Sequence, residues 1–192
     1  MRKIVLASGS AQRKKLLRQL GLKFTIKVSG ADEIQKIQTT PAALVIKNAL
    51  LKARDVAGKS RDAVVIGADT IVYIGKKRMI LKPRSLKEAK KKLKVLFSRP
   101  QWVYTGVAVI DAKTGRTHTG YEKTKVFMMP LTDTEIGRYY KKINPFDKAG
   151  GFDIEGWGSA FIGRIEGCYT NVIGLPMAKL RLMLKKFGIY IL

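Results

Sequence analysis

Apolar residues recur along this chain with two spacings, one typical of amphipathic helices and the other of short buried strands. Helical spacing predicts helices after Ser10, from Pro41 to Ala57, after Ser85, from about Thr132 to Lys142 and from about Pro176 to Phe187. Strand patterns cover residues 2–7, 24–28, 64–72, 102–110, 120–129, 159–165 and 169–173, with 102–110 and 120–129 as the arms of a hairpin. Because helices and strands alternate without a regular βαβ order, the sequence predicts an α/β fold with a mixed sheet rather than a doubly wound parallel one.

Capping signals mark the ends of several predicted helices. Ser10 can cap the first helix and Gly21 can end it. Ser85 and Glu88 form a capping-box pattern, and residues 132–135 repeat the signal at the fourth helix. The predicted inward positions of the helix after Ser85 are Leu86, Ala89, Leu93 and Leu96.

A carboxylate interrupts the most apolar segment of the chain. Asp69 lies within Val64–Val72, a run rich in β-branched residues and too short for a membrane helix. An ionised aspartate in such a segment is costly unless it is paired, hydrogen-bonded or bound to a metal. Asp69 is therefore either a turn or helix-capping residue after Gly67, or part of a functional site.

The composition fits a chain that buries a core without disulfide bonds. Its 192 residues are 46% hydrophobic, which predicts one domain over 1–192, with two lobes around a cleft as a variant. The single cysteine, Cys168, excludes an internal disulfide framework, and one cysteine with one histidine gives no zinc-site spacing. The apolar run 4–7 is too brief for a signal peptide and no stretch approaches a membrane span, so we expect a cytoplasmic location and no membrane partner.

Charge changes this picture of an ordinary domain. The chain has 38 Lys and Arg against 14 Asp and Glu, a formal net charge of +24. Such an excess favours polyanionic partners, such as nucleotides or nucleic acid. The basic residues are spread along the chain, however, and aromatic residues are not interleaved with the basic runs. A solvated, solubilising surface therefore remains an alternative.

A phosphate-binding pattern lies near the N-terminus. Ser8, Gly9 and Ser10 separate a predicted strand from a predicted helix, and Arg13 follows one turn inside that helix. Small residues let backbone N–H groups approach phosphate oxygens, the helix N-terminus adds partial positive charge, and an arginine can bind two oxygens. A simple serine cap with surface basic residues produces the same pattern.

Further charged residues stand in segments where a site can form. Lys52 lies near the end of the second predicted helix, and Lys82 precedes a proline that fixes the chain direction. Glu33 is a loop acid that could join Asp69 in holding a hard divalent cation, or be a solvated loop residue. The segment 147–156 combines charges with Gly150-Gly151, which permits close backbone approach to a ligand; a surface turn is the alternative.

Taken in order, these segments resemble the Maf family of nucleoside triphosphate pyrophosphatases. The resemblance runs collinearly over essentially the whole chain. The matching stretches are Leu6-Ala7-Ser8-Gly9-Ser10 with Arg13, Asp32-Glu33, Lys52-Ala53, Ile66 to Val72, Lys82-Pro83, Thr105 to Ala108, Asp147 to Gly150, and Gly174-Leu175-Pro176. Each motif is short, but the ordered set is specific.

The resemblance implies a fold and an activity. The fold implied is the elongated mixed sheet of inosine triphosphatase-like enzymes, with flanking helices and a central cleft. The activity implied is metal-dependent hydrolysis of a nucleoside triphosphate to the monophosphate and pyrophosphate, with Mg²⁺ or Mn²⁺ as cofactor and a homodimer as a further expectation. The implied roles are Asp69 as catalytic proton acceptor, Glu33 and Asp69 as metal ligands, and Ser8, Arg13, Lys52, Lys82, Asp147 and Lys148 as substrate contacts.

Base choice is the least determined part of this prediction. The family associates it with positions 12, 70 and 155, where this chain has Gln12, Thr70 and Glu155. Thr70 matches the dTTP/UTP branch, but that branch usually has Gln at position 155, and Gln12 replaces an arginine that many relatives carry. The expected substrate is a non-adenine nucleotide such as dTTP or UTP, with 7-methyl-GTP as an alternative. A basic nucleic-acid-binding module and a nucleotide sensor without turnover, on the same scaffold, are the alternative functions, and weak nucleic-acid binding through the basic surface is expected.

Overall fold

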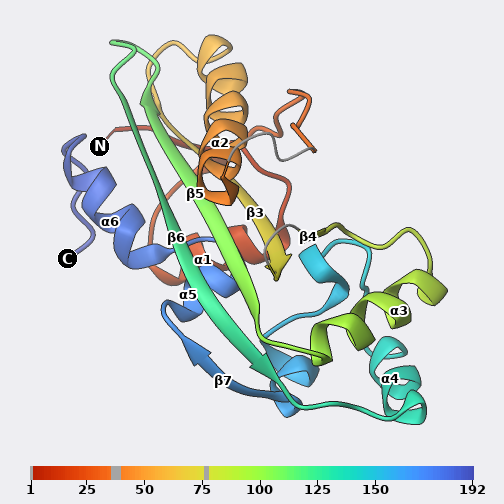
Figure 1. Cartoon of the computed structure of the whole chain (residues 1–192). Helices are drawn as coiled ribbons and strands as arrows, with labels where there is room; N and C mark the ends of the chain where they lie inside the picture. The colour runs from red at the N-terminus through yellow and green to blue at the C-terminus, as the bar shows by residue number, and fades with distance from the viewer. Residues whose placement is uncertain (1, 36–39, 76–77) are drawn as a thin grey trace. The chain divides into compact units, whose positions relative to one another are not determined.

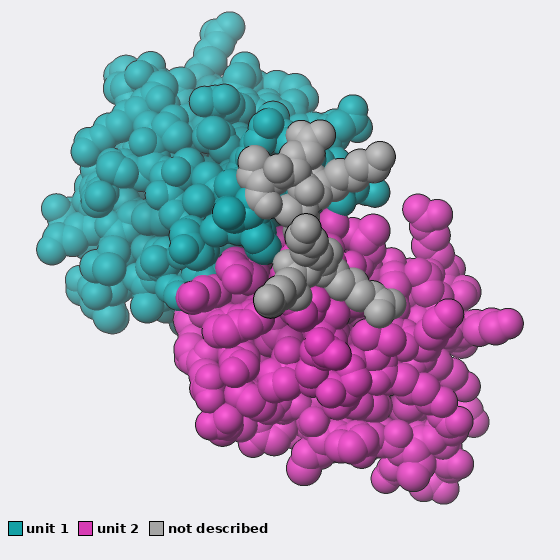
Figure 2. All heavy atoms as spheres, in the orientation of Figure 1, with its two compact units in different colours: residues 1–70, 105–122, 174–192 teal, residues 71–104, 123–173 magenta. Residues whose placement is uncertain are grey.

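The computed structural model describes residues 2–35, 40–75 and 78–192. The chain forms two compact units, which are coloured separately in Figure 2. Unit 1 comprises residues 1–70, 105–122 and 174–192, and unit 2 comprises residues 71–104 and 123–173.

The described strands form one mixed sheet of seven strands with the order β2-β1-β3-β5-β6-β7, and β4 pairs with β3 (Figure 1). The strands are β1 (Ile4–Leu6), β2 (Thr25–Ile26), β3 (Val64–Ile74), β4 (Arg78–Ile80), β5 (Gln101–Asp111), β6 (Thr117–Met128) and β7 (Ile162–Glu166). In this sheet β1 is parallel to both β2 and β3, whereas β3 with β4 and β6 with β7 are antiparallel. The predicted mixed α/β class is therefore confirmed.

In unit 1, helix α2 (Pro41–Gly58) packs against strands β1, β3 and β5. This unit also contains α1 (Ala11–Gln19) and α6 (Met177–Lys185). One core cluster joins alanine and valine side chains of α2 to Val5 of β1, Val65 of β3 and Ala108 of β5. The helix α2 begins after Thr40, whose side chain accepts a hydrogen bond from the Ala43 N–H.

Two glycines let α2 lie unusually close to the sheet. A Cβ atom at Gly67 of β3 would meet the Ala49 carbonyl and would lie 2.8 Å from the Ala53 nitrogen. A Cβ atom at Gly106 of β5 would meet the backbone of Val45. Both positions therefore exclude any larger side chain without displacement of the helix.

Unit 2 has its own core. It contains α3 (Leu86–Phe97), α4 (Asp133–Tyr140), α5 (Tyr169–Ile173) and the short 3₁₀ segments η1 (Ala149–Gly151) and η2 (Gly156–Ala160). Leu93 and Leu96 of α3 pack with Ile136 of α4 and with Phe161, which stands between η2 and β7. Edge-to-face contact between Phe97 and Phe161 extends this cluster.

Most predicted helix ends are confirmed. The Ser10 side chain accepts from the Arg13 N–H, and Gly21 has a φ of 68° after the end of α1. Thr132 and Glu135 form a complete capping box at α4. At α3 the box is incomplete, because the Glu88 carboxylate accepts from the N–H of Arg84 rather than from that of Ser85.

Several element predictions were wrong in part. Residues 169–173 form helix α5 rather than a strand, because tertiary contacts outweigh the local strand preference: the amide of Asn171 donates to the carbonyl of Val103 and to Thr124 Oγ1. Leu86 is 49% exposed instead of inward, since it occupies the first position of α3. Strand β2 keeps only two exposed residues of the predicted 24–28, and β7 begins three residues later than predicted because η2 precedes it.

Among the described residues, none of the helices combines the length and apolar character needed to cross a bilayer.

Candidate active site in unit 1

Asp69 is a strand residue. It lies inside β3 and is only 5% exposed, so the alternative of a turn or helix cap is excluded. Side chains two residues apart on a strand point to the same face. Asp69 therefore shares a face with Gly67, one of the two glycines that α2 approaches closely.

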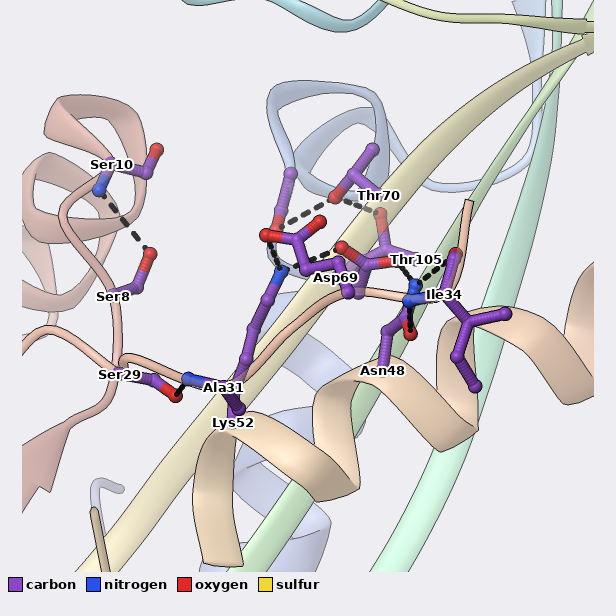
Figure 3. A network of polar contacts seen from close by, with 12 residues as sticks. Ser8, Ser10, Ser29, Ala31, Ile34, Asn48, Lys52, Asp69, Thr70 and Thr105 are labelled. Carbon is purple, nitrogen blue, oxygen red and sulfur yellow. Dashed lines mark hydrogen bonds and ion pairs between the residues drawn. The ribbon is translucent and has the colours of Figure 1, made fainter. Parts of the chain in front are cut away.

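Two residues one helical turn apart on α2 hold the Asp69 carboxylate. Lys52 Nζ donates to Asp69 Oδ1 at 2.7 Å, and Asn48 Nδ2 donates to Asp69 Oδ2 at 3.1 Å (Figure 3). The i, i+4 spacing places both side chains on the same face of α2. Each oxygen of this buried carboxylate thus has a partner, which compensates for the cost of burying its charge.

Lys52 also joins Asp69 to a second acid. Lys52 Nζ lies 2.9 Å from Glu33 Oε1, and Glu33 is on the loop between β2 and α2. The Glu33 side chain is half exposed, whereas that of Asp69 is buried. One ammonium group therefore lies between a buried and an accessible carboxylate.

The loop that presents Glu33 is fixed at two points on α2. Asn48 accepts from the Ile34 N–H at 2.9 Å and donates to the Ile34 carbonyl at 3.1 Å. Asp55 Oδ2 accepts from the Ser29 hydroxyl and from the Gly30 N–H. The hydrogen bond from Lys59, with these two, lowers the pKa of the Asp55 carboxyl to about 2.

The two acids fit a divalent cation that is shared with a phosphate ligand. The Lys52 ammonium already marks a position between them that favours positive charge. The described residues contain no cluster of three or more His, Cys, Asp or Glu side chains suited to a metal. Mg²⁺ is commonly held by one or two carboxylates together with substrate phosphates, so Glu33 and Asp69 match that kind of site.

Arg13 is buried near β3, where its guanidinium donates three hydrogen bonds. Its guanidinium donates to the Gly174 carbonyl at 2.9 Å, to Ser8 Oγ at 3.1 Å and to Thr70 Oγ1 at 3.0 Å. Burial lowers the pKa of the Arg13 guanidinium, while the charges of Asp69 and Glu33 act in the opposite direction. The structure thus places Arg13, Ser8 and Thr70 in one network.

Position 70 is linked to β5 as well. Thr70 Oγ1 lies 3.0 Å from Thr105 Oγ1 and 3.4 Å from the carbonyl of Gly174 (Figure 3). Thr70 directly follows Asp69 on β3. The Asp69 cluster and the Arg13 network are therefore attached to neighbouring residues of one strand, and the charge of Asp69 acts on Arg13.

Hydrogen bonds of Ser8 and Ser10 organise the loop before α1. Ser8 Oγ accepts from the Ser10 N–H at 3.2 Å (Figure 3). Ser10 Oγ donates to Gln12 Oε1 at 3.2 Å. Gly9 is exposed between these serines, and a Cβ atom there would make ordinary contact with the Val28 side chain at 3.6 Å. Ser8, Gln12 and Arg13 are consequently gathered at the start of α1.

The other predicted site residues belong to unit 2. Lys82 is exposed, and its carbonyl, with that of Leu81, accepts hydrogen bonds from Lys92 of α3. Lys148 Nζ donates to Asp147 Oδ1 at 2.8 Å, and Glu155 directly precedes η2.

Two of these unit 2 segments meet. A Cβ atom at Gly151 would lie 3.3 Å from Pro83 Cγ, and the Gly151 N–H donates to the Lys148 carbonyl. Gly151 has a φ of 73°, which a glycine adopts without strain. The loop that carries Lys82 therefore packs against the glycine-rich segment after Lys148.

A family model described as Maf-like protein matches residues 3–187. The chain belongs to the Maf family. The family resemblance of the sequence is thereby confirmed.

Named relatives are similar to this chain over nearly their full length. A protein of Pelotomaculum thermopropionicum named dTTP/UTP pyrophosphatase is 47% identical over 192 residues, which cover 100% of both chains. A protein of Bacillus cereus with the same name is 44% identical and covers 98% of this chain and 97% of its own. Among solved structures, a HAM1 protein from Coxiella burnetii is 17% identical with a TM-score of 0.45, covering 67% of this chain and 73% of its own.

Asn48 is the site residue of this Maf protein that sequence reasoning missed. It is 2% exposed and contacts both Asp69 and the backbone of Ile34. A polar residue at a buried position of the helix 41–58, four residues before Lys52, is the signal that could have revealed it. Thr105 was quoted only as part of a motif, although its hydroxyl contacts Thr70.

Proposed function

We propose that this chain hydrolyses dTTP and UTP to the nucleoside monophosphate and pyrophosphate at the site around Asp69. Full-length relatives at 44–47% identity are named dTTP/UTP pyrophosphatase, which supports the reaction and the substrate. The observation that carries the proposal is the buried Asp69 carboxylate, held by Lys52 and Asn48 beside the accessible Glu33.

In the proposed reaction, a water oxygen forms a bond to the α-phosphorus while the bond from that phosphorus to the α,β-bridging oxygen breaks. The bridging oxygen leaves with pyrophosphate. Asp69 accepts the proton of the attacking water as a general base. Its orientation is fixed by Asn48, which also holds the loop of Glu33.

Basic side chains would stabilise the charge of the triphosphate, which is the main form of catalysis that a protein can supply to this chemistry. Lys52 lies within reach of both acids, so a bound phosphate would compete with Asp69 for its ammonium and leave that carboxylate free to take a proton. Ser8 and Arg13 would bind phosphate oxygens at the start of α1. Lys82 and Lys148, with Asp147 beside them, are the contacts proposed in unit 2.

Glu33 and Asp69 would hold the divalent cation, Mg²⁺ or Mn²⁺, together with phosphate oxygens of the substrate. When bound, the cation would supply further neutralisation of the triphosphate charge.

Selection of the base is proposed to involve Gln12, Thr70 and Glu155. Of these, Thr70 has its Oγ1 atom held in place by Arg13 and Thr105. A cytoplasmic location and a homodimer remain predictions.

Pyrophosphate release from a panel of nucleotides tests the proposal. We expect release from dTTP and UTP when Mg²⁺ or Mn²⁺ is present, and little release from ATP or 7-methyl-GTP. In water enriched with ¹⁸O, the label should enter the monophosphate, because attack is at the α-phosphorus. Label in pyrophosphate, or a preference for 7-methyl-GTP, would contradict the proposal.

A further inference from the structure

The outward face of β5, β6 and β7 within unit 2 carries aromatic and basic side chains. On β6, Thr124 and Val126 are buried, so the alternation of a strand directs Lys123, Lys125 and Phe127 outward. Trp102 of β5 and Arg164 of β7 join them through ring contacts. We call the set Trp102, Lys123, Lys125, Phe127 and Arg164 the aromatic–basic face.

Cations lie over both rings of this face. Lys123 Nζ and Lys125 Nζ are 5.3 and 5.7 Å from the centroid of the Trp102 ring. Lys125 Nζ is also 5.0 Å from the centroid of Phe127, and Arg164 Cζ lies 4.1 Å from the same ring. Energetically significant cation–π contacts occur about once per 70–80 residues. Four such contacts on one sheet face are therefore more than the usual frequency predicts.

Sheet pairing produces an arrangement that the linear sequence does not show. Aromatic residues are not interleaved with the basic runs of the chain, but Phe127 and Arg164 are direct partners across β6 and β7. Trp102 reaches the lysines of β6 from the neighbouring strand. Rings and cations thus alternate across three strands.

We propose that the aromatic–basic face binds single-stranded nucleic acid. Exposed bases stack on aromatic rings without regard to sequence, and lysine and arginine neutralise the phosphates between them. A base stacked on a ring gains more than an exposed ammonium does over the same ring, so bases can displace the lysines toward phosphate oxygens. Paired bases of a duplex are stacked on one another and cannot lie flat on these rings.

One acid lies on the same face. Glu166 is the direct strand partner of Lys125, and its carboxylate is 2.9 Å from the Arg164 guanidinium. An arginine has five N–H donors, so Arg164 can retain Glu166 and still bind a phosphate. The three cations of the face outnumber this carboxylate, and the charge of the whole chain adds to the attraction for a polyanion.

The inference goes beyond nucleotide hydrolysis and shares no residue with it. Loss of nucleic-acid binding and loss of pyrophosphate release are therefore separate outcomes.

Tryptophan fluorescence can report stacking directly. The chain has two tryptophans, so Trp157→Phe leaves Trp102 as the single tryptophan fluorophore. Trp157 is 59% exposed, and Lys142 lies over its ring. The probe is an oligothymidylate of about 12 nucleotides, within the usual site size. We expect it to quench Trp102, and inorganic polyphosphate to bind without quenching. Binding of the oligonucleotide without quenching would overturn the proposal.

Charge variants distinguish binding at the aromatic–basic face from attraction to the basic surface in general. Lys123→Gln/Lys125→Gln should lower the slope of log affinity against log salt by about 1.4, because each phosphate contact to a single strand contributes about 0.7. The matched control is Lys90→Gln/Lys91→Gln, which removes the same charge from exposed positions of α3. An equal decrease of this salt slope in the two double variants would overturn the proposal.

A ring variant tests the stacking itself. Phe127→Leu keeps an apolar side chain but removes the ring, and we expect a loss of affinity of about 5- to 150-fold. Unchanged pyrophosphate release shows that the variant is folded. If release is lost as well, the quenching of Trp102 in the Trp157→Phe chain tests whether bases stack on this face. Oligonucleotide affinity unchanged in Phe127→Leu, or equal affinity for a duplex of the same length, would overturn the proposal.

Discussion

Asp69 illustrates how one residue acquires a role from its neighbours. It is buried in an apolar strand, and the cost of its charge is met by Lys52 and Asn48 of α2. The sequence showed the acid and the lysine as separate signals, 17 residues apart, and the structure joins them at 2.7 Å. The buried amide of Asn48 completes the arrangement.

Glu155 gives a prediction about base choice at the residue scale. An ionised Glu offers only hydrogen-bond acceptors, whereas Gln offers a donor as well, so the two present different patterns to a base edge. We expect Glu155→Gln, alone or with Gln12→Arg, to raise the preference for dTTP and UTP over other nucleotides. The measurement is the ratio of kcat/KM values across a nucleotide panel, and unchanged rankings in both variants would remove these positions from the account.

The grouping of the proposed phosphate-binding residues was predictable because they occupy recognisable local patterns. Ser10 caps α1 as expected, and Arg13 and Ser8 lie together at its start. The hydrogen bonds that the Arg13 guanidinium donates to the Gly174 carbonyl and to Thr70 could not be predicted, because these contacts span 161 and 57 residues of sequence. Long-range hydrogen bonds leave no periodic signal.

At the scale of elements, the distance between α2 and β3 decides whether Lys52 can reach Asp69. Gly67 permits that close approach, because a Cβ atom there would meet the Ala49 carbonyl and the Ala53 nitrogen. We expect Gly67→Ala to destabilise the fold by about 1–3 kcal/mol, since the helix must move outward. Urea unfolding followed by circular dichroism measures this change.

Gly137→Ala is the matched control. Gly137 lies inside α4, where an added Cβ atom would meet nothing within 4 Å. Alanine is the better helix former, so this variant should gain about 0.5–1 kcal/mol. Equal effects of the two substitutions would show that close packing of α2 is not the constraint.

Asp55 gives an acid-stability prediction for the loop of Glu33. Its pKa is lowered to about 2 by Lys59, Gly30 and Ser29, so its contribution to stability is present above its ordinary pKa of 3.8 and is lost as the pH falls toward 2. Wild-type stability should therefore fall more steeply than that of Asp55→Asn between these pH values. Urea midpoints at several pH values test this, and parallel curves would contradict it.

Segment 169–173 shows where propensity fails at this scale. Tyr, Thr, Val and Ile favour a strand, and the sequence was interpreted as one. The Thr124 hydroxyl instead accepts from the Cys168 N–H and donates to the Cys168 carbonyl, while Asn171 binds the β5 backbone at Val103. These tertiary contacts outweigh the local preference, whereas helices with a cap and a long apolar stripe, such as α2, were predicted almost to the residue.

At the scale of the whole molecule, the net charge of +24 should act on encounter with nucleotides more than on chemistry. We expect kcat/KM for dTTP to fall as salt rises from about 50 mM to about 200 mM, while kcat stays nearly constant, because screening weakens long-range attraction. Steady-state kinetics at several salt concentrations measures both constants. A parallel fall in kcat would place the effect of salt on the reaction step.

The central claim is that Asp69 is the general base of pyrophosphate release, and Asp69→Asn tests it most directly. The substitution keeps the shape of the side chain and removes its charge, so the fold should persist, as a urea midpoint can show. The initial rate of pyrophosphate release from dTTP should fall by about two to four decades, the usual loss for an acid–base group. A folded Asp69→Asn variant that keeps most of the wild-type rate would contradict the account.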